Sequence, residues 1–82
     1  MRIRKQPLGT RNMVGVKIEE KRKEIGMKQI ELLKKLEEKG LDFNASGLSK
    51  LEGQIRSITD FELVAISEIL GVSVHWLLGL EK

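Results

Sequence analysis

The 82-residue chain has no cysteine and no tyrosine, and only one histidine, one tryptophan, one proline and two phenylalanines. Without cysteine the chain can form neither a disulfide nor a thiolate metal site. His75 alone cannot build a transition-metal site, so it is better explained as an exposed helix residue. No apolar run approaches the roughly 18 residues of a membrane span, and no apolar stretch of signal-peptide length follows the basic first residues. We therefore expect a cytoplasmic protein with no metal, cofactor or membrane partner.

The chain also has little of what an enzyme needs. A domain of this size buries only roughly 60–65% of the surface that its unfolded chain exposes, so its core is too small for a deep pocket. It lacks a glycine-rich loop that could cradle phosphate, and the usual nucleophiles and bases are scarce. An enzyme is the least favoured class, and we expect a single small binding domain.

Charge is unevenly distributed along the chain. Residues 1–28 hold nine Lys or Arg and three Glu, a balance of +6, whereas residues 59–82 hold one Lys and four acids, a balance of −3. Residues 29–58 hold five charges of each sign. This pattern suits either a protein that turns one face to a polyanion or an ordinary solvated surface.

Helix signals recur, whereas strand signals are weak because apolar and polar residues do not alternate for long. Four times a glycine followed by an apolar residue ends a helical pattern. Glycine readily adopts the left-handed conformation that closes a helix, and the apolar residue after it can fold back onto the last turn. These pairs are Gly26-Met27, Gly40-Leu41, Gly71-Val72 and Gly79-Leu80. The pattern predicts an all-α domain of five short helices.

The first three helices are expected over residues 12–25, 28–39 and 44–52. Asn12 and Asn44 are the candidate N-caps of the first and third, because a short side-chain oxygen can accept from the free amides of a first turn. Apolar side chains spaced three or four apart should face the core. These are Val14, Ile18, Ile25, Leu32, Leu33, Leu36, Leu48 and Leu51.

The start of the fourth helix is the clearest, with Thr59 as N-cap and Glu62 three residues later in a capping box. Its apolar residues lie nearly all round the helix, so we expect it to be central. These are Phe61, Val64, Ala65, Ile66, Ile69 and Leu70. A fifth helix is expected to begin at Ser73.

Basic residues lie before and within the first helix. Residues 1–11 contain Arg2, Arg4, Lys5 and Arg11, and we interpret them as a flexible basic arm ahead of a domain at 12–82. Such an arm can follow phosphates or enter a minor groove, or it can be only a solubilising tail. Lys17, Lys21 and Lys23 are better explained as a solvated face.

Three segments together resemble the phage-repressor, or Xre-type, helix-turn-helix family. They are "GMKQIELL" at 26–33, "LSKLEGQIRSITDFEL" at 48–63 and "ILGVSVHWLLG" at 69–79, and the resemblance covers about residues 12–80. It implies a compact five-helix, lambda-repressor-like fold of prokaryotic or phage origin. The third helix would then dock in the major groove of double-stranded DNA.

The resemblance also implies roles for single residues. Positions facing base edges would be Asn44, Ala45, Ser46 and Lys50, and positions near phosphates would be Gln29 and Arg56. By their own charge, Lys28 and Arg11 would also suit nearby phosphates. Arg22 and Glu52 match a pair that links the first helix to the end of the third. Such a pair would explain why a carboxylate stands in a last helical turn, where it is otherwise unfavourable by roughly 0.3–1 kcal/mol.

The sequence departs from the family pattern at several positions. Lys28 replaces a capping residue, Gly47 lies inside the third helix, and Gln54 stands where the family usually has a glycine. The loop between the second and third helices is also longer than in the shortest members. We expect Gln54 to alter the exit from the third helix and the direction of Arg56.

Two functions remain open from the sequence. The first is a sequence-specific transcriptional regulator, most simply a repressor. The second is a protein-interaction module on the same fold, such as an antirepressor or antitoxin-like partner, because the third helix has no Arg or Gln for bidentate base contacts. Trp76, Leu77 and Leu78 are expected in the core, with a homodimer through the C-terminal helix (Trp76, Leu77) and a palindromic operator as the family-based alternative.

Overall fold

The computed structural model describes residues 8–80, and within them the chain forms five helices and no strand. The helices are α1 (Gly15–Glu24), α2 (Gln29–Glu38), α3 (Ala45–Glu52), α4 (Asp60–Leu70) and α5 (Val74–Leu77). Their Cα atoms span 31 × 30 × 24 Å along the principal axes, so the helices form one compact body. The expected all-α class is therefore confirmed.

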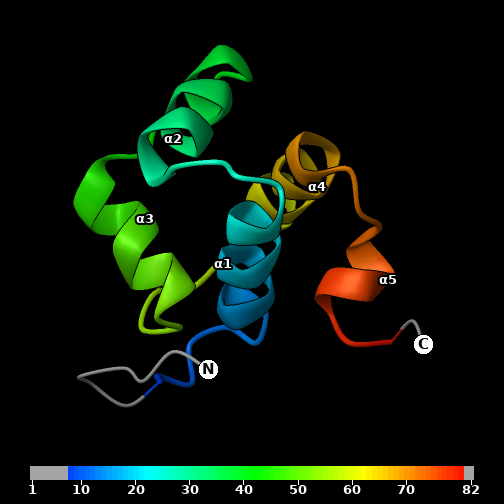
Figure 1. The fold of residues 1–82 in the computed structure, drawn as a ribbon. Coiled ribbons are helices and arrows are strands. Elements are labelled where there is room, and N and C mark those ends of the chain that lie inside the picture. The colour runs from blue at the N-terminus through cyan, green and yellow to red at the C-terminus, as the bar shows by residue number, and fades with distance from the viewer. Residues whose placement is uncertain (1–7, 81–82) are drawn as a thin grey trace.

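Helix α1 lies at the centre of the arrangement (Figure 1). Helix α3 packs against α1 and α2, whereas α4 packs against α1, α2 and α5. In the view of Figure 1, α3 and α5 therefore lie on opposite sides of α1. This arrangement leaves one side of α3 without a neighbouring helix.

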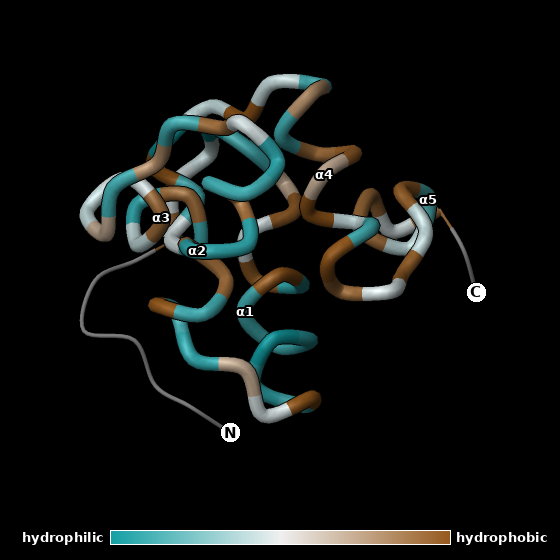
Figure 2. The backbone as a smooth tube through the Cα atoms, turned by 90° about the horizontal axis from the view of Figure 1, so that it is seen from above, coloured by the Kyte–Doolittle hydropathy of each residue, from teal (hydrophilic) through white to brown (hydrophobic). Residues whose placement is uncertain are grey.

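The core is built from the leucine and isoleucine side chains that the sequence pattern selects. Fully buried side chains come from every helix: Ile18, Leu32, Leu36, Leu48, Leu51, Ile66 and Leu77. Polar and apolar residues follow one another along each helix, as amphipathic helices require (Figure 2). Ile25 was expected inside and is instead exposed, because it lies just after the last residue of α1, at its C-cap.

The predicted helix ends are present. The four glycines have positive φ, at 74° for Gly26, 82° for Gly40, 71° for Gly71 and 76° for Gly79. At the start of α4, the Glu62 backbone N–H donates to Thr59 Oγ1 at 3.2 Å, and the Thr59 N–H donates to Glu62 Oε1 at 2.9 Å. The capping box is thus confirmed in both directions.

Helix α1 begins later than expected. Val14, and not Asn12, occupies the N-cap position. Asn12 Oδ1 accepts from the N–H groups of Val14 (3.1 Å) and Gly15 (2.8 Å), while its Nδ2 donates to the carbonyls of Leu51 and Arg56. The side chain therefore still satisfies free amides, but it does so from a turn before the helix and also ties that turn to the end of α3.

Helix α4 is buried on one side only, which corrects the expectation of an almost fully covered helix. Ala65, Ile66 and Leu70 are buried, but Phe61 is 78% exposed and Val64 48% exposed. The remaining helices cover one face of α4, and no described element covers the other.

The segment before α1 is held in place where the structure describes it. The Gly9 N–H donates to the Gly53 carbonyl at 3.0 Å, and the Arg11 N–H donates to the Gln54 carbonyl at 2.9 Å. Within the arm expected over 1–11, paired backbone groups therefore connect Gly9 and Arg11 to the exit of α3. Arg2, Arg4 and Lys5 lie outside the described residues.

Candidate functional site

The uncovered side of α3 presents the four side chains that the sequence assigned to base edges. Asn44, Ala45, Ser46 and Lys50 are all exposed. Leu48 and Leu51 on the opposite side are fully buried. The eight-residue helix α3 thus has one polar side that faces solvent and one apolar side that packs into the core.

Ser49 adds a further hydroxyl to this side that sequence reasoning did not select. It is exposed and follows Leu48 directly. Helical spacing from Ala45 and Ser46 could have indicated it, because residues three and four apart share a face. The polar side of α3 therefore ends in two potential donors, Ser49 and Lys50.

The first turn of α3 uses part of the expected reading surface for its own stability. Asn44 Oδ1 accepts from the Gly47 N–H at 2.6 Å, so the amide oxygen is committed as the N-cap. A Cβ at Gly47 would lie 3.1 Å from this oxygen, tighter than ordinary contact, which explains a glycine inside the helix. The NH₂ group of Asn44 remains for an outside partner, as a donor only.

The last turn of α3 is fixed by a buried polar network. Arg22 Nε lies 2.8 Å from Glu52 Oε2, and Arg22 Nη2 donates to Glu52 Oε1 at 3.0 Å. Arg22 is 6% exposed and Glu52 1% exposed. Arg22 Nη1 also donates to the Met27 carbonyl at 2.9 Å. The bidentate contact expected between these residues is present, and it compensates the carboxylate for its unfavourable place at a helix C-terminus.

Gln29 joins this network, which the sequence did not indicate. Its Nε2 donates to Glu52 Oε1 at 2.9 Å, so the first residue of α2 is tied to the end of α3. One N–H and the carbonyl oxygen of Gln29 are left for other partners. Gln29 can therefore make the expected phosphate contact only through its second amide N–H, while the first remains bonded to Glu52.

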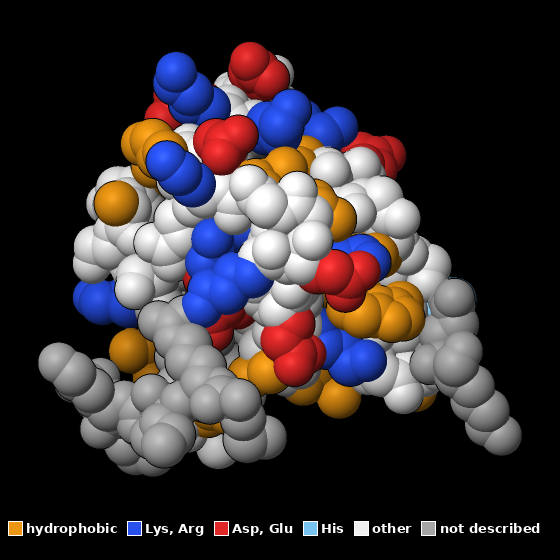
Figure 3. Space-filling view, viewed as in Figure 1, with side chains coloured by type: hydrophobic (Ala, Val, Ile, Leu, Met, Phe, Trp, Pro, Cys, Tyr) orange, Lys and Arg blue, Asp and Glu red, His pale blue; other side chains and the backbone are white. Residues whose placement is uncertain are grey.

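A polar hollow of about 470 Å³ opens in front of this network. Its lining is Glu19, Arg22, Lys23, Lys28, Gln29, Ser49 and Glu52. Lys23 pairs with Glu19 at 3.2 Å, whereas Lys28 forms no ion pair with any of residues 8–80. In Figure 3, basic side chains lie over α2 and between α1 and α3, with acidic ones among them.

Lys28 stands at the N-cap of α2 as the sequence suggested, and its side chain makes no cap hydrogen bond. An ammonium has only donors and cannot accept from the first turn. Instead Glu31 Oε1 accepts from the Lys28 backbone N–H at 3.0 Å. The start of α2 therefore leaves the Lys28 charge available to an anion.

Arg56 does not point freely outward from its loop. Its Nη1 and Nη2 donate to the two Glu62 carboxylate oxygens, each at 3.1 Å, and Nη1 also donates to the Ser57 carbonyl. The guanidinium carbon lies 4.5 Å from the centroid of the Phe43 ring. Arg56 thus connects the residue before the α3 N-cap to the first turn of α4. The sequence reasoning that placed it near phosphates did not detect this second arginine–glutamate pair.

The pair changes the acidity of Glu62. Burial by itself raises the pKa of this carboxyl group, but the hydrogen bonds and charge of Arg56 and the bonds from Thr59 outweigh that effect. The pKa of Glu62 therefore lies below its ordinary value of 4.5. The ionised form is the one that the fold stabilises.

The exit of α3 has an unusual conformation at Gln54. With φ of 62°, it is the only non-glycine residue of positive φ among residues 8–80. Gln54 Oε1 accepts from the Val16 N–H and Nε2 donates to the Gly9 carbonyl, both at 3.3 Å. Gln54 thus adopts the left-handed backbone conformation, and its side chain joins α1 to the segment before it.

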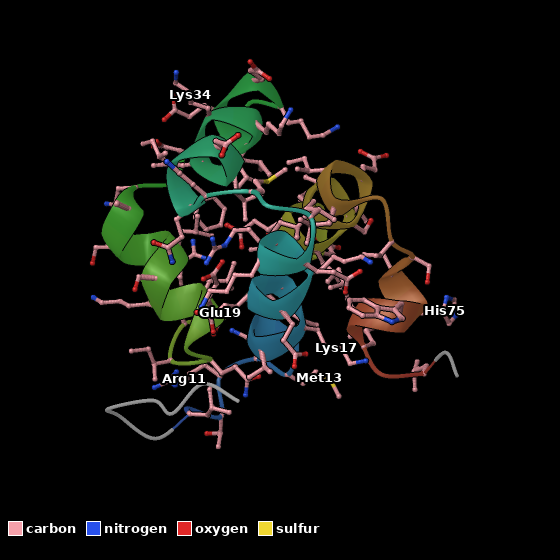
Figure 4. All side chains as sticks on the ribbon, in the orientation of Figure 1. Arg11, Met13, Lys17, Glu19, Lys34 and His75 are labelled. Atoms are coloured by element: carbon pink, nitrogen blue, oxygen red, sulfur yellow. The ribbon has the colours of Figure 1, made fainter. Side chains whose placement is uncertain are left out.

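Arg11 lies close to this exit, below the lower end of α3 in Figure 4, and its side chain is exposed. Lys34, by contrast, lies midway along α2, and its side chain is near the top of the same view. Lys17 points from α1 toward α5, where its Nζ lies 4.5 Å from the centroid of the Trp76 ring. Lys21 Nζ lies 5.8 Å from the same ring, so two of the three lysines expected on a solvated face cover the tryptophan instead.

The C-terminal residues assigned to a dimer contact are largely occupied within the chain. Leu77 is fully buried, and Trp76 is half-buried beneath the two lysines. His75 is exposed and points away from the other helices in Figure 4. Leu77 therefore belongs to the core, as expected from the sequence.

Within residues 8–80, no helix combines the length and apolar character needed to cross a membrane. The same part of the chain contains no cluster of three or more His, Cys, Asp or Glu side chains that could hold a metal ion. Comparison with protein-family models, with curated proteins and with solved structures finds no match for this chain. The function must therefore be argued from the geometry of the site.

Proposed function

We propose that the protein is a transcriptional regulator that binds double-stranded DNA by inserting α3 into the major groove. The observation that supports this most is the contrast between the two sides of α3. One side is bare and polar from Asn44 to Lys50, while the other carries two fully buried leucines. A major groove about 12 Å wide admits one α-helix, and a bare polar helix face is what reads base edges there.

The rigidity of α3 supports the same function. Arg22 and Gln29 fix its last turn through Glu52, and Arg56 fixes the approach to its first turn through Phe43 and Glu62. A reading helix must keep one pose relative to the phosphate contacts, since these contacts set its register on the duplex. Two arginine–glutamate pairs on either side of an eight-residue helix suit that requirement.

Affinity would come mainly from phosphates. Lys28 and Lys50 carry charges that no described acidic residue neutralises, and Gln29 keeps one amide N–H. Arg11 lies beside the exit of α3. By contrast, Ser46 discriminates bases poorly, and Ala45 can only touch a thymine methyl. We therefore expect strong salt dependence and modest sequence preference.

A protein-interaction module on the same fold is the second candidate. The donor-only state of Asn44 favours it, because it removes one of the few groups able to read a base. In that case α3 would serve as a stable scaffold and the partner would be a protein.

Fluorescence anisotropy with duplexes selected from a random pool separates the two candidates. A DNA-binding regulator should bind with a Kd that rises steeply between 50 and 200 mM salt, because neutralised phosphates release counterions. Lys50→Ala should weaken binding and lower the slope of log K against log salt by about one. Lys34→Ala removes the same charge from an exposed position midway along α2 and is the matched control. Absence of binding at micromolar protein and 50 mM salt would refute the proposal.

A further inference from the structure

The most exposed large apolar side chain among residues 8–80 is Phe61, which is 78% exposed on the first turn of α4. Val64, one turn further along, is 48% exposed. Residues three apart share a helix face, so the two side chains form one apolar strip. The helix cap uses Thr59 and Glu62 and needs neither of them. An exposed aromatic ring beside a second apolar side chain is typical of a surface that binds a partner.

A groove of about 570 Å³ lies beside this strip, between the end of α2 and α4. Its apolar lining consists of Leu41, Phe61, Val64 and Ala65. Asp60 and Glu68 also line the groove and mark its length along α4. At 1.5 Å per helical residue they are about 12 Å apart along the helix axis, roughly two helical turns. The groove is therefore long enough for two side chains that project from consecutive turns of a second helix.

The rim of the groove has an excess of negative charge. Helix α4 carries three carboxylates and no lysine or arginine. Glu62 is bound to Arg56, and Glu68 Oε1 lies 3.0 Å from Lys39 Nζ, so these two carboxylates are balanced within the chain. Asp60 forms no ion pair in the part of the chain that the structure describes, and its Oδ1 accepts from the backbone N–H of the next residue at 2.8 Å. One carboxylate at the groove is therefore left without a cation.

This charge narrows the choice of partner. A carboxylate without a cation repels the phosphates of nucleic acids and the headgroups of anionic lipids, so neither class suits the groove. A second copy of the chain would supply no free cation, because a two-fold contact repeats the same acidic rim. An apolar segment that also carries a lysine or arginine suits both features of the surface. Its apolar residues fill the groove, and its cation meets Asp60.

We propose that this groove binds an amphipathic helical segment of another protein. Two apolar side chains of that segment, three or four residues apart, lie against Phe61 and Val64, as in other helix-in-groove contacts. A lysine or arginine next to them faces Asp60. None of the residues that line the groove belongs to α3, so the partner binds whether or not α3 is occupied by DNA. The contact does not depend on the proposed DNA-binding function.

A random peptide library displayed on phage and selected on the whole chain tests the proposal. Peptides of roughly 16 residues are long enough for about four helical turns. Each enriched sequence is made as a fluorescent peptide, and anisotropy gives its Kd. At least one should bind about tenfold or more weakly to Phe61→Ser, because the ring is the largest apolar surface of the contact. Leu80→Ser removes a 69% exposed leucine outside the groove, and this matched control should leave the Kd unchanged.

The sequences of the peptides that depend on Phe61 test the chemistry of the partner. They should carry two large apolar residues three or four apart, with at least one lysine or arginine beside them. Asp60→Lys should weaken such a peptide about fivefold, because an attractive pair becomes a repulsive one. Replacing the basic residue of the peptide by glutamate should weaken binding to the unchanged protein by a similar factor.

The combination of the two charge changes is the sharpest readout. The glutamate peptide should regain its affinity on Asp60→Lys, which a merely structural role of Asp60 would not produce. Glu20→Lys makes the same charge change at an exposed position of α1 outside the groove, and it should restore nothing. Circular dichroism checks that each variant keeps the helical fold.

Three results would overturn the proposal. The first is a selection without any peptide that depends on Phe61, and the second is a set of such peptides without basic residues. The third is self-association of the chain that Phe61→Ser abolishes, measured by sedimentation equilibrium without peptide, since it would assign the groove to a second copy. None of these measurements involves DNA, so failure of this proposal and failure of the proposed function are separate results.

Discussion

Arg22 and Glu52 form a buried bidentate ion pair that joins the last turn of α1 to the last turn of α3. The distances are 2.8 Å from Nε to Oε2 and 3.0 Å from Nη2 to Oε1. Gln29 donates to the same carboxylate, so three helices meet at Glu52. The carboxylate depends on protein donors, because it is 1% exposed and has little access to water.

Replacing one member of this pair should therefore destabilise the protein strongly. Arg22→Met leaves the Glu52 charge buried without the guanidinium that neutralises it, and we expect a loss of about 3–5 kcal/mol in the free energy of unfolding. Urea unfolding followed by circular dichroism measures it. The double variant Arg22→Met with Glu52→Leu should lose much less, since no charge is then left unpaired. A double variant that loses the sum of both single changes would contradict this account.

The backbone at Gln54 gives a second prediction. Its φ of 62° is unfavourable for a residue with a Cβ, by roughly 1–2 kcal/mol. Gln54→Ala keeps that strain and removes the bonds to Val16 and Gly9, so it should destabilise the protein by about 1–2 kcal/mol. Gln54→Gly loses the same bonds but relieves the backbone, and it should be more stable than the alanine variant by about 1 kcal/mol. Equal stability of the two variants in urea would show that the backbone is not strained.

Local sequence patterns predicted the helix ends well. Capping at Thr59 and Glu62 depends on residues three apart, and closure at Gly40 or Gly71 depends on one residue's own conformation. Such signals need no knowledge of the rest of the fold. The starting turn of α1 was misplaced because Asn12 also bonds to Leu51 and Arg56, which lie about forty residues away in sequence.

Burial and side-chain partners were harder to predict. Periodicity shows that α4 is apolar, but it does not show that no described helix covers Phe61 and Val64. The contact of Arg22 with Glu52 and the assignment of Arg56 to phosphates both came from the family resemblance, and the resemblance did not indicate that Glu62 also binds Arg56. Glu62 binds both Thr59 and Arg56, and the contact with Arg56 across the loop follows no helical or strand periodicity that could be seen in the sequence.

Arg56 gives a third prediction, which rests on the proposed DNA-binding function: its main role there would be to position α3. It is bound to Glu62 and stacked on Phe43, so a phosphate contact would compete with bonds already made. Arg56→Lys keeps the charge but loses the planar fork, and we expect DNA binding to weaken about tenfold with an unchanged salt slope. Anisotropy titrations at several salt concentrations measure both quantities.

Glu62→Gln is the matched test of the same role. Removing a carboxylate near DNA should strengthen binding if charge alone matters. If Arg56 acts by positioning α3, the glutamine variant should bind more weakly than the unchanged protein. Tighter binding by Glu62→Gln, together with Arg56→Lys that binds normally, would assign Arg56 to the phosphates instead.

The lowered pKa of Glu62 gives a fourth prediction, on stability in acid. In the unfolded chain this carboxyl group titrates near 4.5, whereas in the fold Arg56 and Thr59 keep it ionised to lower pH. A carboxyl group whose pKa is lower in the folded state contributes stability above its unfolded pKa. That contribution is lost as the pH falls from about 4.5 through the lowered folded value.

Urea unfolding of the unchanged protein and of Glu62→Gln between pH 2.5 and 7 tests this prediction. The glutamine keeps the cap on Thr59 but cannot ionise. The difference in unfolding free energy should therefore be constant above about pH 5.5 and shrink steadily below about pH 4.5. With Arg56→Gln in both proteins the shrinkage should largely disappear, because the charge that lowers the pKa is gone. A difference that stays constant down to pH 2.5 would mean that the pair contributes nothing through ionisation of Glu62.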